Sequence, residues 1–464
     1  MQHMSRHSKS TAILLAILIA YIMMPIIGLS VNVALPAIGK SLSSNPVVLG
    51  WISISFLLSI AVFAIPAGKL AEIYGRKKIF LWGTIICTAT SFLLAVSHSA
   101  VLLIVFRAVQ GIGGGMILNT GLVIVSSIYP AGRRGKPLGL CMAAVYTGQT
   151  IAPFLGGLLT HHLGWRSIFL ANVPFGLFVI FFMLWKIDEE WVDVTGEKID
   201  SIGAVIFGIM LVLIMYGLSI LPSSMGFWLI AGGLVCGAVF IKWEMKVDLP
   251  LLELKLFREN RVFLFSLLSA FIFYSAVFAV SFLLSLYLQY SKGFTPQKAG
   301  FVLVSQPLFQ AILSPVAGRL VDRFRPHLLS LVGMASATLG ILLFSCITTD
   351  THLSQIVLAL FLVGAGWAFF VSTNMNDAIG SVDKKYYGTA SGMIATIRQI
   401  GMMLSVALAM LIFSLLMGET QVTPENVGLL LKSVKAAFFV LTMMCFMGLF
   451  ALLYRGIRLT VKLK

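Results

Sequence analysis

One charged residue, Arg107, lies inside the apolar run LLIVFRAVQGIGGGM at 102–116. Its guanidinium stays protonated and cannot carry a proton itself, but it can donate several hydrogen bonds to carbonyl oxygens or to an anion. At the centre of a membrane helix such a charge costs about 2.5 to 3.5 kcal/mol on insertion scales, so it is expected to face protein or water. Two roles stay open. Arg107 either clasps neighbouring helices or acts as a functional charge that tunes a carboxyl group or holds an anionic substrate, and the functional role is the first expectation.

The composition places this run in a lipid environment. Hydrophobic residues make up 59% of the chain, charged residues 11%, and the mean hydropathy is +0.99. Apolar stretches long enough to cross a hydrocarbon core of about 30 Å recur along the whole chain. We predict an all-α polytopic membrane protein with fourteen transmembrane helices, the first of which stays in the mature protein. They are expected at 11–39, 47–70, 78–97, 100–128, 136–160, 166–186, 200–220, 226–243, 261–290, 297–320, 326–347, 354–379, 388–417 and 430–454.

The net charge of +16 reflects membrane orientation. Threading the predicted helices with the N-terminus inside puts 25 of the 33 lysines and arginines on the inner side and 6 on the outer side. This asymmetry is typical of cytoplasmic loops, so both termini are predicted to be cytoplasmic in a protein of the plasma (inner) membrane. The same distribution argues against nucleic acid as a partner.

Catalytic and metal-binding patterns are weak throughout the chain. The glycines at 111–115 lie within a predicted membrane helix, with no preceding strand and no Lys-Ser/Thr continuation, so they do not form a nucleotide loop. The five cysteines all lie in predicted spans, and no His and Cys spacing suggests zinc. We therefore predict no enzyme activity, no cofactor and no metal site. Any uphill work must draw on a gradient.

Two similar segments indicate an internal repeat. GKLAEIYGRKK begins at Gly68 and GRLVDRFRPH begins at Gly318, each with an acid four residues after the glycine and each expected in a cytoplasmic turn. Their spacing fits two six-helix bundles separated by an inserted helix pair, and repeated bundles are typical of transporters. The predicted domains are a cytoplasmic N-terminus at 1–10, a bundle at 11–186, the inserted pair with its connectors at 187–260, a bundle at 261–454 and a cytoplasmic C-terminus at 455–464.

At this level of detail the sequence resembles the fourteen-helix drug/proton antiporter branch of the major facilitator superfamily, across essentially the whole chain. The resemblance is carried by GKLAEIYGRKK at 68–78, LIVFRAVQGIGGG at 103–115, GQTIAPFLGGLL at 148–159, NVALP at 32–36, WRSIFLANVPFG at 165–176 and RQIG at 398–401. It implies a secondary transporter that works by rocking two bundles about a central site. It also implies exchange of the substrate for protons.

The resemblance assigns conformational roles to the loop motifs. In the turn at 68–78, the glycines allow a tight backbone and Glu72 is expected to pair with Arg76 or a neighbouring helix end, while the lysines face anionic lipid. This turn is expected to latch the two bundles together on the cytoplasmic side in the outward-open state. The alternative is a plain basic turn that sets topology. The residues assigned to the latch and its repeat are Gly68, Gly75, Arg76, Lys77, Gly318 and Arg323.

A second motif predicts close helix packing. Gly148, Ala152 and Gly156 form a small-residue stripe with Pro153 beside it, which favours close approach and bending of the helix. With Gly157, the motif is expected to act as a seal and pivot between the bundles. The glycines that begin at Gly111 are likewise expected to bring a neighbouring helix close.

Acidic residues that could carry a coupling proton are scarce within the spans. The resemblance places an acid of many relatives at the position of Ile27, and no acid occurs between Thr11 and Gly39. Asp377 lies near the cytoplasmic end of its predicted helix, where a solvated helix end is the alternative to a coupling role. The candidates for coupling or gating are Arg107, Asp377, Arg398, Glu72 and Asp322, together with Asp200.

The remaining polar residues of the spans outline an uncharged to cationic pocket. Each is also compatible with an ordinary hydrogen bond between helices. The candidate cavity residues are Asn32, Asn119, Tyr146, Gln149, Tyr274, Tyr287, Gln306, Gln310, Asn374 and Gln399. Since no acid joins them, neutral, zwitterionic or anionic amphiphiles are favoured as substrates.

We predict a secondary active transporter that exports drugs or other amphipathic small molecules in exchange for protons. Three alternatives stay open: a facilitator without proton coupling, an exporter of lipid-like or anionic metabolites, and a non-transporting membrane sensor on the same fold. The expected partners are a small-molecule substrate, protons and the lipid bilayer. Substrate identity and oligomeric state are not predicted.

Overall fold

The computed structural model describes residues 6–129, 135–186, 200–247, 260–321, 323–324, 326–383, 387–418 and 420–461, which are almost entirely helical. The first half contains α1 (Arg6–Ser41), α2 (Pro46–Tyr74), α3 (Arg76–Ala95), α4 (Ala100–Ile128), α5 (Gly135–Leu163), α6 (Ser167–Leu170) and α7 (Asn172–Lys186). A hairpin follows, formed by α8 (Ser201–Ser219) and α9 (Ser224–Glu244). The second half contains α11 (Arg261–Val277), α12 (Val280–Leu286), the π-helical turn η2 (Tyr287–Ser291), α13 (Pro296–Leu303), α14 (Ser305–Val321), α15 (Pro326–Ser345), α16 (Leu353–Gly380), α17 (Tyr387–Met417), the short η4 (Pro424–Asn426) and α18 (Val427–Val461).

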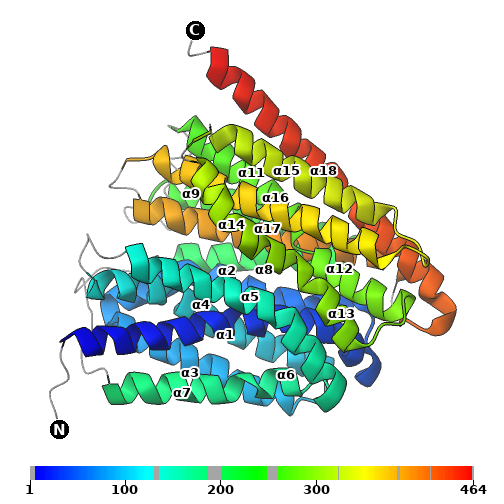
Figure 1. Ribbon diagram of the computed structural model, residues 1–464, viewed down its shortest axis with the longest axis horizontal. Coiled ribbons are helices and arrows are strands. Elements are labelled where there is room, and N and C mark those ends of the chain that lie inside the picture. Colours follow the sequence, from blue (N-terminus) through cyan, green and yellow to red (C-terminus); the bar gives the residue numbers. More distant parts are fainter. Residues whose placement is uncertain are drawn as a thin grey trace.

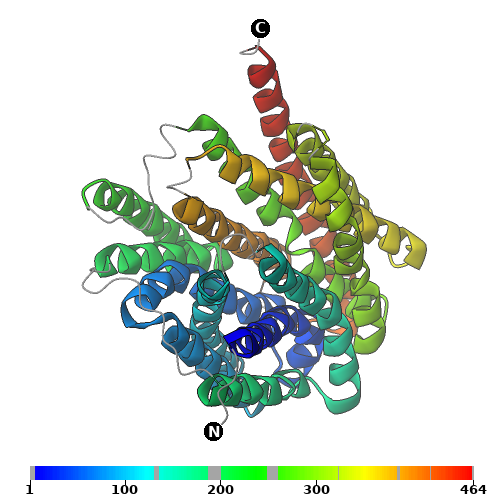
Figure 2. The same ribbon diagram turned by 60° about the vertical axis from the view of Figure 1, so that its left-hand side comes forward.

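Within the described residues, 14 helical segments are long and apolar enough to cross a membrane, which confirms the predicted fold class. The first and second halves form two adjacent bundles, and both chain ends lie at the same end of the helices (Figure 1). We refer to this end as the termini side and to the opposite end as the far side. The hairpin of α8 and α9 lies outside the two bundles (Figure 2).

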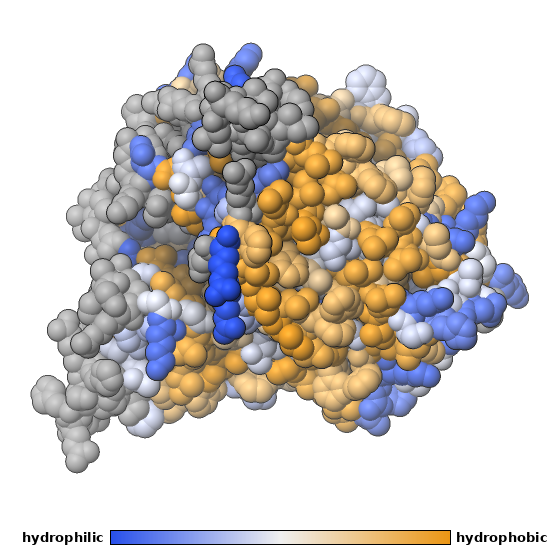
Figure 3. Space-filling view, turned by 45° about the horizontal axis from the view of Figure 1, so that its top comes forward, coloured by the Kyte–Doolittle hydropathy of each residue, from blue (hydrophilic) through white to orange (hydrophobic). Residues whose placement is uncertain are grey.

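The surface matches a chain embedded in lipid. A broad apolar band crosses the middle of the molecule, with hydrophilic side chains gathered toward its two ends (Figure 3). Large apolar side chains within this surface include Phe181, Trp228 and Phe450, all strongly exposed. An exposed apolar area of this extent fits burial in a hydrocarbon layer rather than contact with water.

Local chemistry defines several helix ends. Asn45 caps α2 by accepting a hydrogen bond from the backbone of Val48 at 2.9 Å, and Asn260 caps α11 in the same way. Such caps satisfy donors that the first helical turn leaves unpaired. Gly75 joins α2 to α3 with φ of 105°, a conformation that favours glycine.

The turns expected around Gly68 and Gly318 are shorter than predicted. Gly68 lies inside α2, which continues to Tyr74, and only Gly75 breaks the backbone before α3 begins. Gly318 lies inside α14. The prediction of turns at these two glycines was wrong because an isolated glycine is tolerated within a helix at a cost of about 1 kcal/mol.

Two predicted spans of the second half are interrupted helices. The span at 261–291 consists of α11, α12 and η2, and the backbone amide of Ala279 donates to the Ser405 hydroxyl at 2.9 Å at its first break. The span at 296–321 breaks at Val304, between α13 and α14. Pro307 lacks the amide hydrogen that would bond the carbonyl of Leu303, which weakens the helix at this point.

Candidate substrate cavity

A cavity of about 600 Å³ lies between the two halves. One wall is α5 and the facing wall is α14, and Ser372 of α16 also contributes to the lining. All of these segments belong to the termini-side portions of their helices. The lining residues are Gly139, Met142, Ala143, Tyr146, Thr147, Thr150, Ile151, Leu308, Ala311, Ser314, Pro315 and Ser372.

Tyr146 links the cavity wall to a cationic centre. Its hydroxyl lies within hydrogen-bonding reach of Ser314 and is near enough to Arg398 of α17 for an electrostatic influence of the guanidinium. Arg398 also interacts with Tyr274 of α11, whose ring packs edge-on against Trp367 at 5.4 Å between centroids. Because no acidic residue is among the lining residues, this part of the cavity favours neutral or anionic groups.

The halves meet closely on the far side. Gln289 donates from its side-chain amide to the carbonyl of Val33 at 2.8 Å, and the Tyr290 hydroxyl donates to the carbonyl of Pro36 at 3.2 Å. Both donors lie on η2, and both acceptors lie on α1. The π-helical turn therefore ties the second half to the first at the end opposite the chain termini.

Glycine contacts extend this closure. A Cβ added at Gly157 of α5 would lie 2.5 Å from the carbonyl oxygen of Pro296, and one added at Gly300 would lie 2.3 Å from that of Pro153. Backbone at such distances leaves no room for a side chain. The cavity is thus bounded on the far side by helices in direct backbone contact.

The small residues of the α5 motif contact two different helices, α1 and α13. Gly148 and Gly156 face α1 in their own half, where added Cβ atoms would meet Ile22 and Ser30. Pro153 and Gly157 face α13 of the other half. Of the predicted seal and pivot residues, only the latter pair lies at the contact between halves.

Arg107 lies away from the cavity, in the interior of the first half. Its side chain is 0% exposed and donates to the carbonyls of Ile27 and Ile52, each at 3.1 Å. It also donates to the Gln110 side chain at 2.8 Å, and the guanidinium lies over the Phe56 ring at 4.2 Å. The geometry is that of a clasp joining α4 to α1 and α2, the structural alternative considered from the sequence. Ile27 is the residue at the sequence position where the resemblance places an acid, and it binds Arg107 through its backbone carbonyl.

Gln110 extends the clasp to α3. Its amide nitrogen donates to the Ser91 hydroxyl at 2.8 Å. Glycines make this packing possible, since Gly111 contacts the backbone of α2 at Phe56 and Gly113 contacts that of α3 at Gly83. The motif that begins at Arg107 thus builds the interior of the first half.

Three residues that were predicted to line the cavity form hydrogen bonds to residues of their own half. Asn32 accepts a hydrogen bond from the Ser53 hydroxyl at 3.0 Å, and Asn119 donates to the carbonyl of Gly115 in its own helix at 2.8 Å. Tyr287 is fully buried and donates to the carbonyl of Thr348 at 2.6 Å. None of the three is among the residues that line this cavity. The positions of polar residues along a helix do not specify which face meets the other half.

The remaining predicted cavity residues lie on helices around the cavity without lining it, apart from Tyr146. Gln306 and Gln310 lie on α14, where their backbone packs against Gly364 of α16. Asn374 donates to the carbonyl of Ser266 at 3.1 Å, and the side-chain oxygen of buried Gln399 has no hydrogen-bond partner among the described residues. Gln149 is half-buried on α5, next to the lining residue Thr150.

The predicted latch residues stay within the first half in this conformation. Glu72 forms an ion pair with Lys69 at 3.1 Å, one turn earlier on α2. Arg76 donates to the Ser127 hydroxyl of α4, and Lys77 is half-buried in the first turn of α3. Glu72 thus forms its ion pair with Lys69 and also interacts electrostatically with Arg76, the partner expected from the sequence.

The corresponding segment of the second half is described in part. Gly318 has open space around it, and Arg323 is exposed in the turn after α14. Asp322 lies outside the described residues. Asp377 is half-buried near the termini-side end of α16, and Asp200 caps α8 through the backbone of Gly203 at 2.8 Å.

Small lining residues were not predicted from the sequence. Thr147, Thr150 and Ser314 are common in membrane helices and carry no charge. Their spacing could have indicated them. Positions 139, 143, 146 and 150 share one face of α5, and positions 308, 311 and 315 share one face of α14. Among the described residues no group of three His, Cys, Asp or Glu side chains could hold a metal ion.

Comparison with known proteins identifies the family of this chain. The sequence profile of the major facilitator superfamily matches residues 13–406. The riboflavin transporter RibZ of Clostridioides difficile is 26% identical over 437 residues, covering 94% of this chain and 95% of that protein. The multidrug resistance protein Stp of Mycobacterium tuberculosis is 31% identical over 383 residues, covering 80% of this chain and 70% of that protein.

Solved structures share the fold. A peptide transporter bound to alafosfalin superposes with a TM-score of 0.70 at 14% identity, covering 96% of this chain and 97% of the other. A bacterial homologue of the human lysosomal transporter Spinster gives a TM-score of 0.69 at 15% identity, with 96% of each chain covered. Together with the profile match and the 14 spans, these likenesses identify a multi-pass transporter fold rather than an enzyme. The chain belongs to the major facilitator superfamily.

Proposed function

We propose that this protein exports neutral or anionic amphipathic aromatic compounds across the plasma membrane in exchange for protons. The observation that carries the proposal is the cavity between α5 and α14, with Tyr146 and the Arg398 centre beside it and the far side closed. An aromatic and cationic site without acids suits a flat, electron-rich molecule or a carboxylate.

The relatives support this substrate class. A riboflavin transporter and a multidrug resistance protein are among the similar proteins. Riboflavin is a neutral fused-ring compound with a polar chain, and a pocket lined by Tyr146 and by threonine and serine hydroxyl groups can stack and hydrogen-bond such a molecule. Organic dications fit this pocket poorly because Arg398 would repel them.

The distribution of basic residues supports the direction of transport. Lysines and arginines are concentrated on the side of the chain ends, which in the positive-inside pattern is cytoplasmic. With the termini side in the cytoplasm, the cavity is loaded from inside the cell. Breaking the contacts of η2 with α1 and closing the termini side would then deliver the substrate outside.

Proton exchange needs a group that titrates, and Asp377 is our candidate. Its place near the termini-side end of α16, three residues from buried Asn374, would let a proton bound there alter the packing of this helix. Facilitated transport without protons is the second candidate function. The specific observation favouring it is that no acid lines the cavity.

The test is transport by purified protein in proteoliposomes loaded with riboflavin, with and without an imposed pH gradient. We expect riboflavin to accumulate against its concentration gradient only when the pH gradient is present, and Asp377→Asn to abolish accumulation while leaving downhill flux. Equal downhill flux with and without the gradient would instead establish a facilitator. Saturable binding without flux of any compound in an amphiphile panel would establish a sensor and overturn the proposal.

A further inference from the structure

The boundary between the two halves, called the seam here, reaches the lateral surface of the molecule on two sides, or flanks. The hairpin of α8 and α9 covers one of these flanks. On this flank α2 of the first half lies beside α17 of the second, and α8 packs against both. Trp51 of α2 donates to the Ser219 hydroxyl of α8 at 3.0 Å, and Ser414 of α17 donates to the carbonyl of Leu221 at 2.6 Å. Nearer the middle, Val62 of α2 meets α8 at Gly208. The hairpin therefore shields this seam from lipid.

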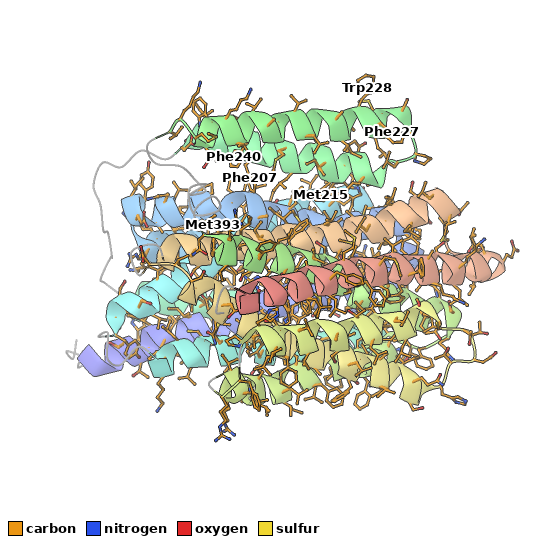
Figure 4. All side chains as sticks on the ribbon, turned by 90° about the horizontal axis from the view of Figure 1, so that it is seen from above. Phe207, Met215, Phe227, Trp228, Phe240 and Met393 are labelled. Carbon is orange, nitrogen blue, oxygen red and sulfur yellow. The ribbon has the colours of Figure 1, made fainter. Side chains whose placement is uncertain are left out.

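The hairpin stands at one edge of the molecule. Figure 4 shows α8 and α9 there, with Phe207 and Phe240 between the two helices and Trp228 at the outer surface. The Phe207 and Phe240 rings lie 5.3 Å apart between centroids. This packing makes the hairpin a firm lateral cover.

The opposite flank, formed by α5 with α13 and α14, is closed only in part. Its contacts are those of Gly157 with Pro296, Pro153 with Gly300, and the Thr150 hydroxyl with the carbonyl of Pro307 at 3.4 Å. All of them lie at mid-depth or on the far side. Figure 1 looks onto this flank, with α5 and α14 in front.

On the termini side of these contacts the seam is the cavity itself. The walls there carry small side chains, including Ala143 and Thr147 on α5 and Ala311 on α14. Small residues on both walls leave the space between the helices unfilled. The structure thus has a covered flank and a flank where the cavity extends to the seam.

Polarity changes from the seam toward the interior. The apolar residues Met142, Ile151 and Leu308 line the cavity and are also 41%, 36% and 41% exposed. The polar lining residues Tyr146, Ser314 and Ser372 are half-buried, and Arg398 lies near enough to Tyr146 to influence it electrostatically. An amphiphile lying across this gradient keeps its tail against lipid and apolar side chains while its head reaches hydrogen-bond donors and a cation.

We infer that the gap between α5 and α14 is a lateral opening through which an amphiphile in the termini-side leaflet reaches the cavity. Its anionic or hydrogen-bond-accepting head contacts Tyr146 and the Arg398 centre, and its tail stays between Met142 and Leu308. Access is restricted to this flank because α8 covers the other. The inference rests on the proposed export function and specifies its substrate as a molecule already partitioned into the membrane.

The test is fluorescence quenching, which does not depend on transport. Ser372→Cys is introduced with Cys236→Ser and Cys346→Ser, labelled with an NBD maleimide, and reconstituted in phosphatidylcholine and phosphatidylglycerol vesicles containing doxyl-labelled lipid. We expect lipid quenching several-fold stronger than that of a label at Val62→Cys, which faces α8 on the covered flank. Labelling at Ser314→Cys provides a second reporter, on α14 of the same half.

Narrowing the gap gives the matched comparison. Ala143→Trp combined with Ala311→Trp is expected to reduce lipid quenching of the Ser372 label several-fold while quenching by aqueous iodide persists. Quenching of both reporters by iodide but not by doxyl lipid would overturn the lateral opening and leave the proposed export intact. Strong lipid quenching in a protein that transports no compound would support the opening and refute the export function.

Discussion

Arg107 and Arg398 both lie well inside membrane spans, and their surroundings differ. Arg107 is fully enclosed and directs its hydrogen bonds to Ile27, Ile52 and Gln110. Arg398 is half-buried and interacts with tyrosines at the edge of the cavity. In the first half the Arg107 guanidinium is therefore stabilised by hydrogen bonds to backbone carbonyls and Gln110. In the second half Arg398 is stabilised by polar surroundings next to the cavity. These surroundings support a structural role for Arg107 and the proposed contact of Arg398 with a substrate.

The seam between the halves shows the same contrast. Its far end is packed backbone to backbone and tied by hydrogen bonds from η2, whereas its termini-side end holds the cavity. An alternating-access transporter must exchange these two conditions in its cycle. Substitutions at the far end are thus expected to shift the conformational equilibrium, while those around Arg107 are expected to affect folding.

The largest effect is expected from Arg107→Met. Hydrogen bonds to a charged group are worth about 1.5 to 3 kcal/mol each, and this variant removes three and deprives the buried Gln110 side-chain oxygen of its donor. We expect little folded protein, measured as the monodisperse fraction in size-exclusion chromatography of the detergent extract. Arg398→Met is the matched control and is expected to remain folded. Normal yield and thermal stability of Arg107→Met would contradict the clasp.

Gly157→Ala is expected to open the far side. Its Cβ would meet the carbonyl oxygen of Pro296 at 2.5 Å, and overpacking of this kind costs about 1 to 3 kcal/mol. Spin labels at Leu42→Cys and Thr423→Cys should report a larger population with a separated far side. Gly428→Ala, where no atom lies within 4 Å of the added Cβ, should leave the distance distribution unchanged.

A smaller shift is expected from the η2 contacts. Gln289→Ala and Tyr290→Phe each remove one hydrogen bond to α1, worth about 1 kcal/mol, so each should favour the far-side-open state about fivefold. The same spin-label pair measures the shift. If the double variant retains the parental distance distribution, η2 does not hold the far side closed.

The smallest effect is expected from Glu72→Gln. Its ion pair with Lys69 is partly exposed, and such pairs contribute about 0 to 1 kcal/mol. Thermal stability should change by less than the uncertainty of the measurement. A lower transport rate at unchanged stability would instead support the predicted latch in another conformation of the cycle.

Much of the fold could be predicted from the sequence, because apolar stretches of membrane length indicate which residues form the transmembrane helices. The breaks at Val304 and at Ala279 could not. A proline such as Pro307 does not by itself specify a break, since Pro153 lies inside continuous α5, and the Ala279 amide donates to Ser405 of a distant helix. Gly68 and Gly318 misled the prediction of turns because glycine also occurs inside helices.

The residues of the candidate site were harder to predict from the sequence than the helices. Of the predicted cavity residues, Tyr146 lines the cavity, whereas Asn32, Asn119 and Tyr287 form hydrogen bonds inside their own halves. The choice between cavity and interior depends on helix rotation, which tertiary packing sets. Arg107 illustrates the point, since the carbonyls that satisfy it belong to other helices.

The most direct test of the account is riboflavin transport by Arg398→Gln and Arg398→Lys in proteoliposomes, normalised to folded protein. Loss of a charged hydrogen-bond donor should lower the initial rate about tenfold or more in Arg398→Gln, while Arg398→Lys, which keeps the charge, should retain a measurable part of it. Thermal stability of both variants should match that of the parent protein. Undiminished transport by Arg398→Gln would contradict the assignment of the cavity beside Arg398 as the substrate site.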